Sequence, residues 1–158
     1  MSEFNKFNEL RAKHPQFIYH SFELNENELV FHFQIDKFHF HPTWRFNLNL
    51  DEYKFDRGQA ELIAFSLGMA ELVSYWKCAC CPTVEVRCGG LSEWQRLWWK
   101  KLYFNGLGEF FYRNGITTDF EGFMKIEAHE SPEPPKCKPE LSGALVPVGG
   151  GKDSVVSL

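Results

Sequence analysis

Six consecutive residues near the end of the sequence have the types and spacing best suited to chemistry: Gly149, Gly150, Gly151, Lys152, Asp153 and Ser154. The apolar run at 144–148 predicts a buried strand, and Asp153 and Ser154 are typical residues at the start of a helix. Consecutive glycines let backbone N–H groups converge on one point, and a helix start adds partial positive charge there. The segment therefore predicts a cradle for the phosphates of a nucleotide.

The details of this segment separate it from two common phosphate loops. A Walker A loop would need Gly at Val146 and Ser or Thr at Asp153, and the dinucleotide-binding pattern would need Gly at Ser154. The Ser-Gly-Gly-x-Asp-Ser pattern of pyrophosphatase-type (PP-loop) adenylating enzymes fits instead, with Gly149 in place of the leading Ser. Enzymes with that loop resemble one another in cutting ATP between its α and β phosphates. The alternative is a glycine-rich turn without a ligand.

A second candidate group recurs every four residues. Asn105, Glu109 and Arg113 would line one face of a helix, in a stretch where Gly106 and Gly108 lower helix propensity. Something that approaches this face closely, such as another helix or a ligand, would explain the glycines. The alternative is an ordinary Glu–Arg pair on a helix surface, and spacing alone favours it.

Three histidines alternate with apolar residues in the first half of the chain. Alternation places His32, His39 and His41 on the wetter face of a sheet, where the His-x-His pair could chelate a metal. The alternative is that they are polar residues on an exposed face. No carboxylate or cysteine follows at a recognisable ligand spacing, so no metal site is predicted here.

The cysteines do not have the paired spacing of a zinc site. Cys78, Cys80 and Cys81 lie together and Cys88 follows, whereas zinc ligands usually come as pairs with short fixed gaps. We therefore expect free thiols, buried or partly exposed. The odd total of five cysteines suits a reducing compartment.

The elements that must position these residues follow from the apolar periodicity. A short helix is expected at 3–13, then strands at 16–24, 28–35 and 38–50, the last bent at Pro42. An apolar helix at 58–77, a strand at 83–87, a turn at Gly89 and Gly90, and a second long helix opened by Ser92 with Gln95 as a capping box come next. The prediction is an α+β fold, an antiparallel β-meander with two long buried helices.

Composition divides the 158 residues into three parts. We predict an α+β domain at 1–127, a proline-rich linker at 128–142, and at 143–158 the first strand and glycine loop of an α/β adenine-nucleotide-binding domain. A single strand and loop cannot make a nucleotide-binding sheet. We therefore expect the chain to be the N-terminal piece of a longer protein, inactive by itself.

Charge and hydropathy restrict the partners. The net charge of −4 gives no basic footprint for nucleic acid. No apolar run approaches the length of a membrane span, and the polar start has no apolar core of a signal peptide. The expectation is a cytoplasmic protein without a nucleic-acid or membrane partner, and the sequence does not predict an oligomeric state.

Three segments resemble a known family in order and spacing. Residues 68–77, 102–114 (with Asn-Gly-Leu-Gly-Glu-Phe at 105–110) and 145–154 (with Gly-Gly-Gly-Lys-Asp-Ser at 149–154) are similar to the N-terminal third of the MurL family. The resemblance covers residues 60–158. The family consists of ATP-dependent UDP-N-acetylmuramoyl-L-alanyl-L-glutamate epimerases, which are isomerases of peptidoglycan synthesis.

The resemblance implies a role for each candidate residue. ATP with Mg²⁺ would convert the terminal L-glutamate carboxylate into an acyl-adenylate, releasing pyrophosphate; inversion of the α-carbon and hydrolysis would then give AMP and the D-glutamyl product. The three glycines would hold pyrophosphate, Ser154 would donate to a phosphate, Lys152 would offset charge, and Asp153 would orient the loop or help to hold Mg²⁺. The helical trio at 105, 109 and 113 would contact the UDP-linked substrate or the nucleotide domain. The acid and base that move the α-proton are not identifiable from this sequence.

Two other functions fit parts of the pattern. One is a different PP-loop adenylating enzyme, such as one that modifies a tRNA base, although those usually bring a basic surface or paired cysteines. The other is a non-catalytic α+β module that binds a ligand or a protein partner.

Overall fold

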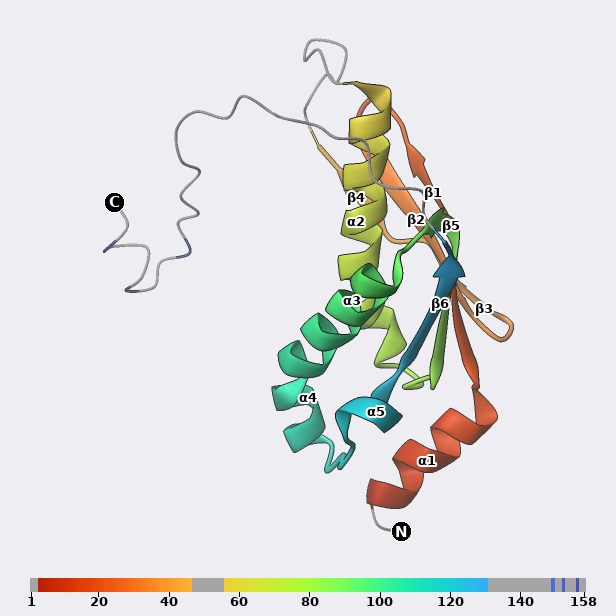
Figure 1. The fold of residues 1–158 in the computed structure, drawn as a ribbon, viewed down its shortest axis with the longest axis vertical. Helices are drawn as coiled ribbons and strands as arrows, with labels where there is room; N and C mark the ends of the chain where they lie inside the picture. The colour runs from red at the N-terminus through yellow and green to blue at the C-terminus, as the bar shows by residue number, and fades with distance from the viewer. Residues whose placement is uncertain (1–2, 47–55, 131–148, 150–151, 153–155, 157–158) are drawn as a thin grey trace.

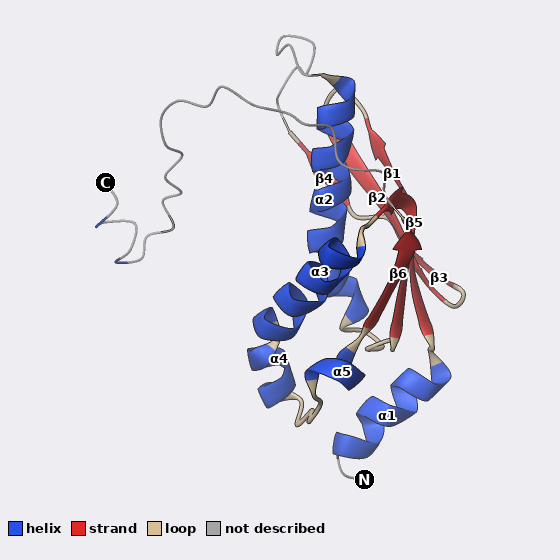
Figure 2. Cartoon of the chain, in the orientation of Figure 1, coloured by secondary structure: helices blue, strands red, loops and turns tan. Residues whose placement is uncertain are grey.

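A computed structural model describes residues 3–46 and 56–130 and positions 149, 152 and 156, with the side chains of 3–5 excepted. Its elements, in chain order, are α1 (Glu3–Lys13), β1 (Gln16–Leu24), β2 (Glu28–Ile35), β3 (Phe38–Phe40), β4 (Thr43–Arg45), α2 (Arg57–Trp76), β5 (Thr83–Gly90), α3 (Glu93–Gly106), α4 (Gly108–Arg113), α5 (Phe120–Phe123) and β6 (Lys125–His129) (Figures 1 and 2). Helices α2, α3 and α4 lie on one side of the sheet, and α1 lies at the end where β1 begins.

The sheet is mixed, with strand order β3-β2-β1-β5-β6 and with β4 also paired to β2. The predicted antiparallel meander is present as β1, β2 and β3, but β1 pairs in parallel with β5, and β5 pairs in parallel with β6. The meander prediction was therefore incomplete. Parallel neighbours need a crossover connection, and α3, α4 and α5 provide it between β5 and β6.

The predicted third strand is a broken edge strand. β3 pairs with one end of β2 and β4 with the other, on the same edge. Pro42 lies between them, and its carbonyl oxygen accepts a hydrogen bond from Phe31 N at 3.0 Å. The predicted bend at Pro42 is confirmed, while residues 47–50 of the predicted strand lie outside the described residues.

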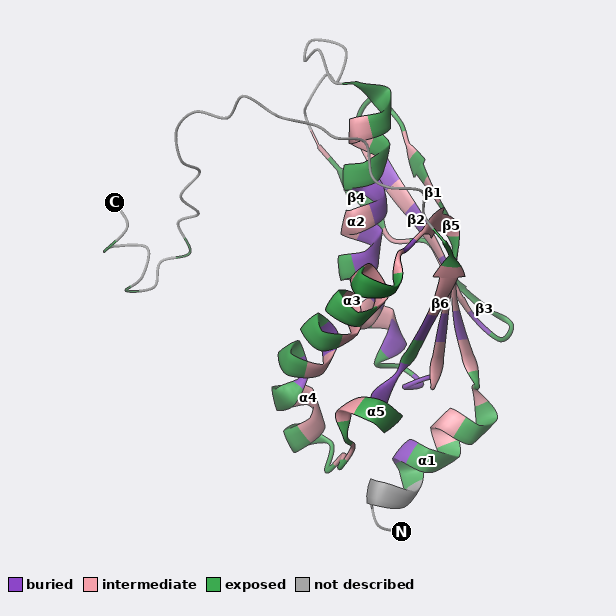
Figure 3. Ribbon diagram, in the orientation of Figure 1, coloured by how far each residue is buried: buried purple, intermediate pink, exposed green. Residues whose placement is uncertain are grey.

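The core lies between α2 and the sheet and is dominated by aromatic rings. Tyr19 on β1 is fully buried; its ring stacks with Phe65 of α2 at a centroid distance of 6.0 Å and meets Phe33 edge-on at 5.1 Å. The helix can approach this closely because Gly68 faces the strand: a Cβ there would lie 2.0 Å from Tyr19 Oη. Figure 3 shows the buried residues on the sheet-facing side of α2.

A second glycine has the same function one strand away. Gly89 was predicted to lie in a turn, but it and Gly90 belong to β5. A Cβ at Gly89 would lie 2.5 Å from Phe65 Cε2. The turn prediction was wrong because both glycines continue the strand, and Gly89 leaves room for the Phe65 ring above it, a need that no local sequence signal reveals.

The two long helices differ in burial. The prediction of two buried helices is confirmed for the sheet-facing side of α2, where Ala64, Met69 and Trp76 are among the buried residues. It was wrong for α3, where only Tyr103 is buried. Helix α3 packs against β6, which is an edge strand of the sheet, so only one side of the helix faces the core (Figure 3).

The domain ends later than predicted. Strand β6 extends to His129, two residues into the predicted linker, and residues 131–142 of that linker lie outside the described part of the chain.

Among the residues that the structure describes, no helix combines the length and apolar character needed to cross a bilayer.

Candidate functional site

The glycine-rich segment is described at two of its six predicted residues. Gly149 and Lys152 are both exposed, and a Cβ at Gly149 would meet nothing within 4 Å. Gly150, Gly151, Asp153 and Ser154 lie outside the described residues. The segment's donor set, backbone amides with one ammonium and one hydroxyl, suits an anionic ligand. The phosphate cradle, ATP and Mg²⁺ remain predictions.

The helical trio is divided between two helices. Leu107, with φ −94° and ψ 10°, ends α3 and precedes α4, so Asn105 lies on α3 and Glu109 and Arg113 lie on α4. Arg113 Nε lies 2.8 Å from Glu109 Oε1, and both side chains are about three-quarters exposed. Asn105 is exposed as well. The structure thus forms the Glu–Arg surface pair, and substrate contact by the trio remains a prediction.

The three predicted histidines gather near one edge of the sheet. His32 Nε2 lies 3.0 Å from Glu23 Oε1, and the Nδ1 atoms of His32 and His41 are 2.7 Å apart. A neutral pair satisfies both contacts when His32 donates to the carboxylate through Nε2 and accepts the Nδ1–H of His41. The ring of His39 stacks on that of His41. Within the described residues, no group of three or more His, Cys, Asp or Glu side chains is placed to hold a metal ion.

The cysteine segment lies in the connection between α2 and β5. Cys80 and Cys81 are buried and Cys78 is exposed, all as free thiols, which confirms that expectation. Burial raises the pKa of Cys80 to about 11 and that of Cys81 to about 12, so both thiols stay protonated and unreactive near neutral pH. Their backbone is tied down: Arg11 Nη1 donates to Cys80 O and Trp76 Nε1 donates to Cys81 O. The segment has a structural role.

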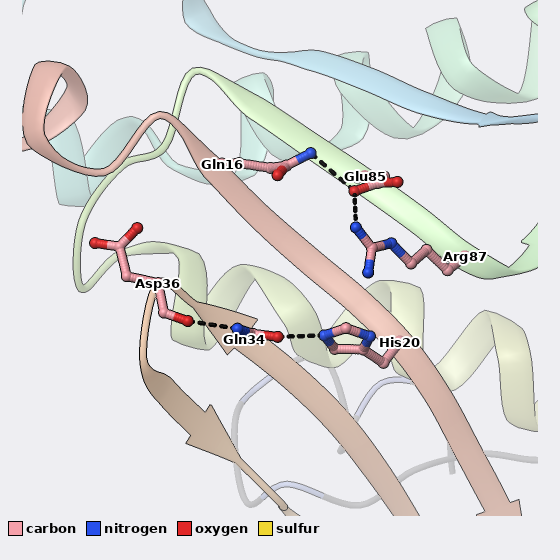
Figure 4. Close-up of polar contacts among 6 residues, drawn as sticks. All are labelled: Gln16, His20, Gln34, Asp36, Glu85 and Arg87. Atoms are coloured by element: carbon pink, nitrogen blue, oxygen red, sulfur yellow. Dashed lines mark hydrogen bonds and ion pairs between the residues drawn. The ribbon is translucent and has the colours of Figure 1, made fainter.

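Sequence reasoning missed a polar group on the sheet face opposite α2, shown in Figure 4. At its centre Glu85 Oε2 accepts hydrogen bonds from Arg87 Nη2 at 2.7 Å and from Gln16 Nε2 at 2.8 Å. The hydrogen bond from Arg87, together with the positive charge of Arg87, lowers the pKa of Glu85 against a smaller opposing effect of burial. Glu85 therefore stays ionised, and the group presents a paired charge on the open face.

A β-bulge places His20 beside this group. The register between β1 and β2 shifts between Tyr19 and Ser21, so His20 has no direct partner on β2. Its Nε2 contacts Oε1 of Gln34 on the polar face (Figure 4). The sequence contains a signal for this bulge, because the inward apolar positions change from odd numbers at 17 and 19 to even numbers at 22 and 24.

A cavity of about 400 Å³ between α3, α5 and β6 was not predicted either. Three cations line it, Arg96, Lys100 and Lys125, together with two carboxylates. Arg96 Nη1 donates to Leu91 O at 2.9 Å and Lys100 Nζ donates to Glu121 O at 3.3 Å, so these two cations are partly held by backbone carbonyls, and Lys125 Nζ pairs with Glu127 Oε1 at 2.6 Å. The remaining N–H groups suit a small anion.

Comparisons with known proteins agree on one family. The family described as MurL N-terminal domain matches residues 6–158. Over 86 residues, 54% of this chain, the sequence is 34% identical to a UDP-N-acetyl-alpha-D-muramoyl-L-alanyl-L-glutamate epimerase of Xanthomonas oryzae pv. oryzae (strain MAFF 311018). The same 86 residues are 19% of that relative, so this chain spans only a minor part of its length. No solved structure gives a significant match.

Proposed function

The chain belongs to the MurL family, and from that membership we propose that it is the N-terminal domain of a longer enzyme that epimerises the terminal glutamate of a UDP-muramoyl-L-alanyl-L-glutamate. The observation that carries the proposal is the family match over 6–158, joined with the epimerase activity for which the relative is named. The enzyme would then supply the D-glutamyl precursor of peptidoglycan.

The chemistry of the proposal explains the need for a nucleotide. The α-proton of glutamate is too weakly acidic to be removed beside a carboxylate anion. ATP supplies the adenylyl group that neutralises this carboxylate, so the neighbouring C–H can lose its proton and regain it on the other face. The donor set at 149–154 suits the pyrophosphate that leaves in that step. We place the proton-transferring groups in the part of the enzyme beyond this chain.

The test is a product analysis with the longer protein that carries this chain. It is incubated with ATP, Mg²⁺ and the L-glutamyl nucleotide; AMP and pyrophosphate are quantified, and the configuration of glutamate is determined after hydrolysis. We expect equal amounts of AMP and pyrophosphate, and D-glutamate only when ATP is present. The 158-residue chain, treated in the same way, is expected to be inactive.

A matched pair of variants connects the activity to the loop. Ser154→Ala removes the predicted phosphate donor and should lower kcat/KM by roughly 10–100-fold, whereas Ser157→Ala, three residues later, should leave it unchanged. Formation of AMP without inversion would disprove the epimerase. Stimulation of ATP–pyrophosphate exchange by tRNA instead of the nucleotide substrate would assign the chain to a different adenylating enzyme.

A further inference from the structure

The outer side of α3 is an apolar stripe, which we define as Trp94, Leu97, Trp98 and Leu102. These side chains are 69%, 53%, 46% and 46% exposed, respectively. Their three- and four-residue spacing places them on one face of the helix. Exposed single hydrophobic residues are common, but a contiguous group containing two tryptophans is typical of an interface.

The stripe is presented by a well-anchored helix. On the opposite side of α3, Tyr103 is buried and its Oη donates to Met69 O of α2 at 2.6 Å, while Trp99 packs against the Tyr103 ring. The N-terminus of α3 is held by a complete capping box between Ser92 and Gln95. The apolar side chains are therefore held on a rigid surface and cannot turn inward to bury themselves.

The chain leaves the described domain next to this stripe. His129 O, at the end of β6, accepts a hydrogen bond from Leu91 N at 2.9 Å, and Arg96 Nη1 donates to Ala128 O at 3.4 Å. Polypeptide that follows His129 therefore starts beside the first turns of α3, the part of the helix that carries Trp94 and Leu97. A segment tethered so close has a far higher effective concentration at the stripe than a separate molecule.

We propose that the apolar stripe of α3 is the docking surface for the polypeptide that follows His129, folded as the second domain of the same chain. The occupant is tethered, because the curated relative is close to three times as long as this chain and the additional residues need a place to pack. Lys101 and Asn105 are exposed between and beside the apolar residues. The covering surface is therefore expected to be apolar with a carboxylate near Lys101. The proposal rests on family membership and not on the epimerase activity.

The test measures side-chain accessibility in the longer protein and in the 158-residue chain. Leu97→Cys and Trp98→Cys introduce single thiols into the stripe, and Lys13→Cys introduces one at an exposed position of α1, the helix at the end of the sheet where β1 begins (Figure 1). Reaction with a maleimide is followed by peptide mapping, which separates the new thiols from the native cysteines. Circular dichroism confirms that each variant is folded.

We expect the two stripe thiols to react at least about tenfold more slowly in the longer protein than in the 158-residue chain, and the thiol at position 13 to react equally in both. If each of the three thiols reacted at the same rate in the longer protein as in the 158-residue chain, the proposal would be overturned. Protection in the longer protein that grows with its concentration would also overturn it, because a second copy would then cover the stripe. Labelling needs no turnover, so a failed epimerase assay leaves this result interpretable.

Discussion

At the scale of single residues, the short distance between α2 and the sheet depends on Gly68, which has no side chain. Tyr19 is fully buried among the rings of Phe31, Phe33 and Phe65, and its hydroxyl lies against Gly68. The thiol of Cys88 lies beside this hydroxyl but is a weak partner, and among the described residues no hydrogen bond of normal geometry satisfies it. The close approach therefore serves packing of the ring and not a polar contact.

Gly68→Ala tests this packing. The new Cβ would lie 2.0 Å from Tyr19 Oη and 2.9 Å from Phe31 Cδ1, and both residues are fully buried. We expect the free energy of unfolding, measured with urea on the 158-residue chain, to fall by about 1–3 kcal/mol. Gly106→Ala is the matched control: its Cβ would meet nothing within 4 Å, so it should leave stability unchanged or raise it by up to about 1 kcal/mol. Equal effects of the two substitutions would contradict the account.

The Glu85–Arg87 pair predicts a pH dependence. The folded-state pKa of Glu85 is lowered, so the pair stabilises the fold above the ordinary value of 4.5, and this contribution is lost as the pH falls through the folded-state pKa. Arg87→Gln removes the largest cause of the shift and should raise the pKa of Glu85, measured by carbon NMR of the carboxyl group. Arg57→Gln also removes one surface cation, but that cation pairs with Glu61. It should leave the Glu85 titration unchanged; equal shifts in both variants would point to net charge instead.

At the scale of elements, the sequence predicted the helices and strands that are defined by signals within their own residues. The bounds of α1, β1 and β2 agree with the predictions, because Pro15 ends the first helix and the alternation of apolar residues sets the strands. The capping box at Ser92 was also predicted and is present. Strand β6 and helix α5 were missed, since each has at most five residues and is defined by pairing or packing with segments far away in the chain.

Arg11 connects such distant elements. Its guanidinium donates to Cys80 O and Phe123 O through Nη1 and to Gly122 O through Nη2, each at 2.9 Å. Arg11→Met leaves these carbonyl oxygens without that donor, and we expect it to lower the free energy of unfolding by on the order of 2–3 kcal/mol.

Lys13→Met is the control for Arg11, because it makes the same change on the exposed side of the same helix and should alter stability by less than about 0.5 kcal/mol. Urea unfolding of both variants measures the difference. If Arg11→Met had no larger effect than its control, the hydrogen bonds from α1 to Cys80 and to the Gly122–Phe123 segment would not contribute to stability.

At the scale of the whole molecule, the candidate sites divide by how they are assembled. The segment at 149–154 could be proposed from sequence because its chemistry lies in consecutive residues. The group around Glu85 could not, because it joins β1 and β5, and the parallel pairing of these strands leaves no mark in either segment alone. The cationic cavity is missed for the same reason, since it takes its lining from α3, α5 and β6.

The apolar stripe of α3 should dominate the solution behaviour of the 158-residue chain. Trp94 and Trp98 are exposed, and Trp98 touches the inner residue Trp99 at a ring-centroid distance of 4.9 Å, so replacing both by charged residues leaves the buried core residues in place. We expect Trp94→Glu/Trp98→Lys to raise solubility and reduce binding of the dye ANS. The free energy of unfolding should change by no more than about 1 kcal/mol. Trp99→Lys is the control on the inner side of the same helix, where the ring packs against Tyr103; it should destabilise the fold and increase ANS binding. Light scattering and urea unfolding separate the two effects. A double variant as destabilised as the control would show that the outer tryptophans belong to the core, and that α3 carries no free surface.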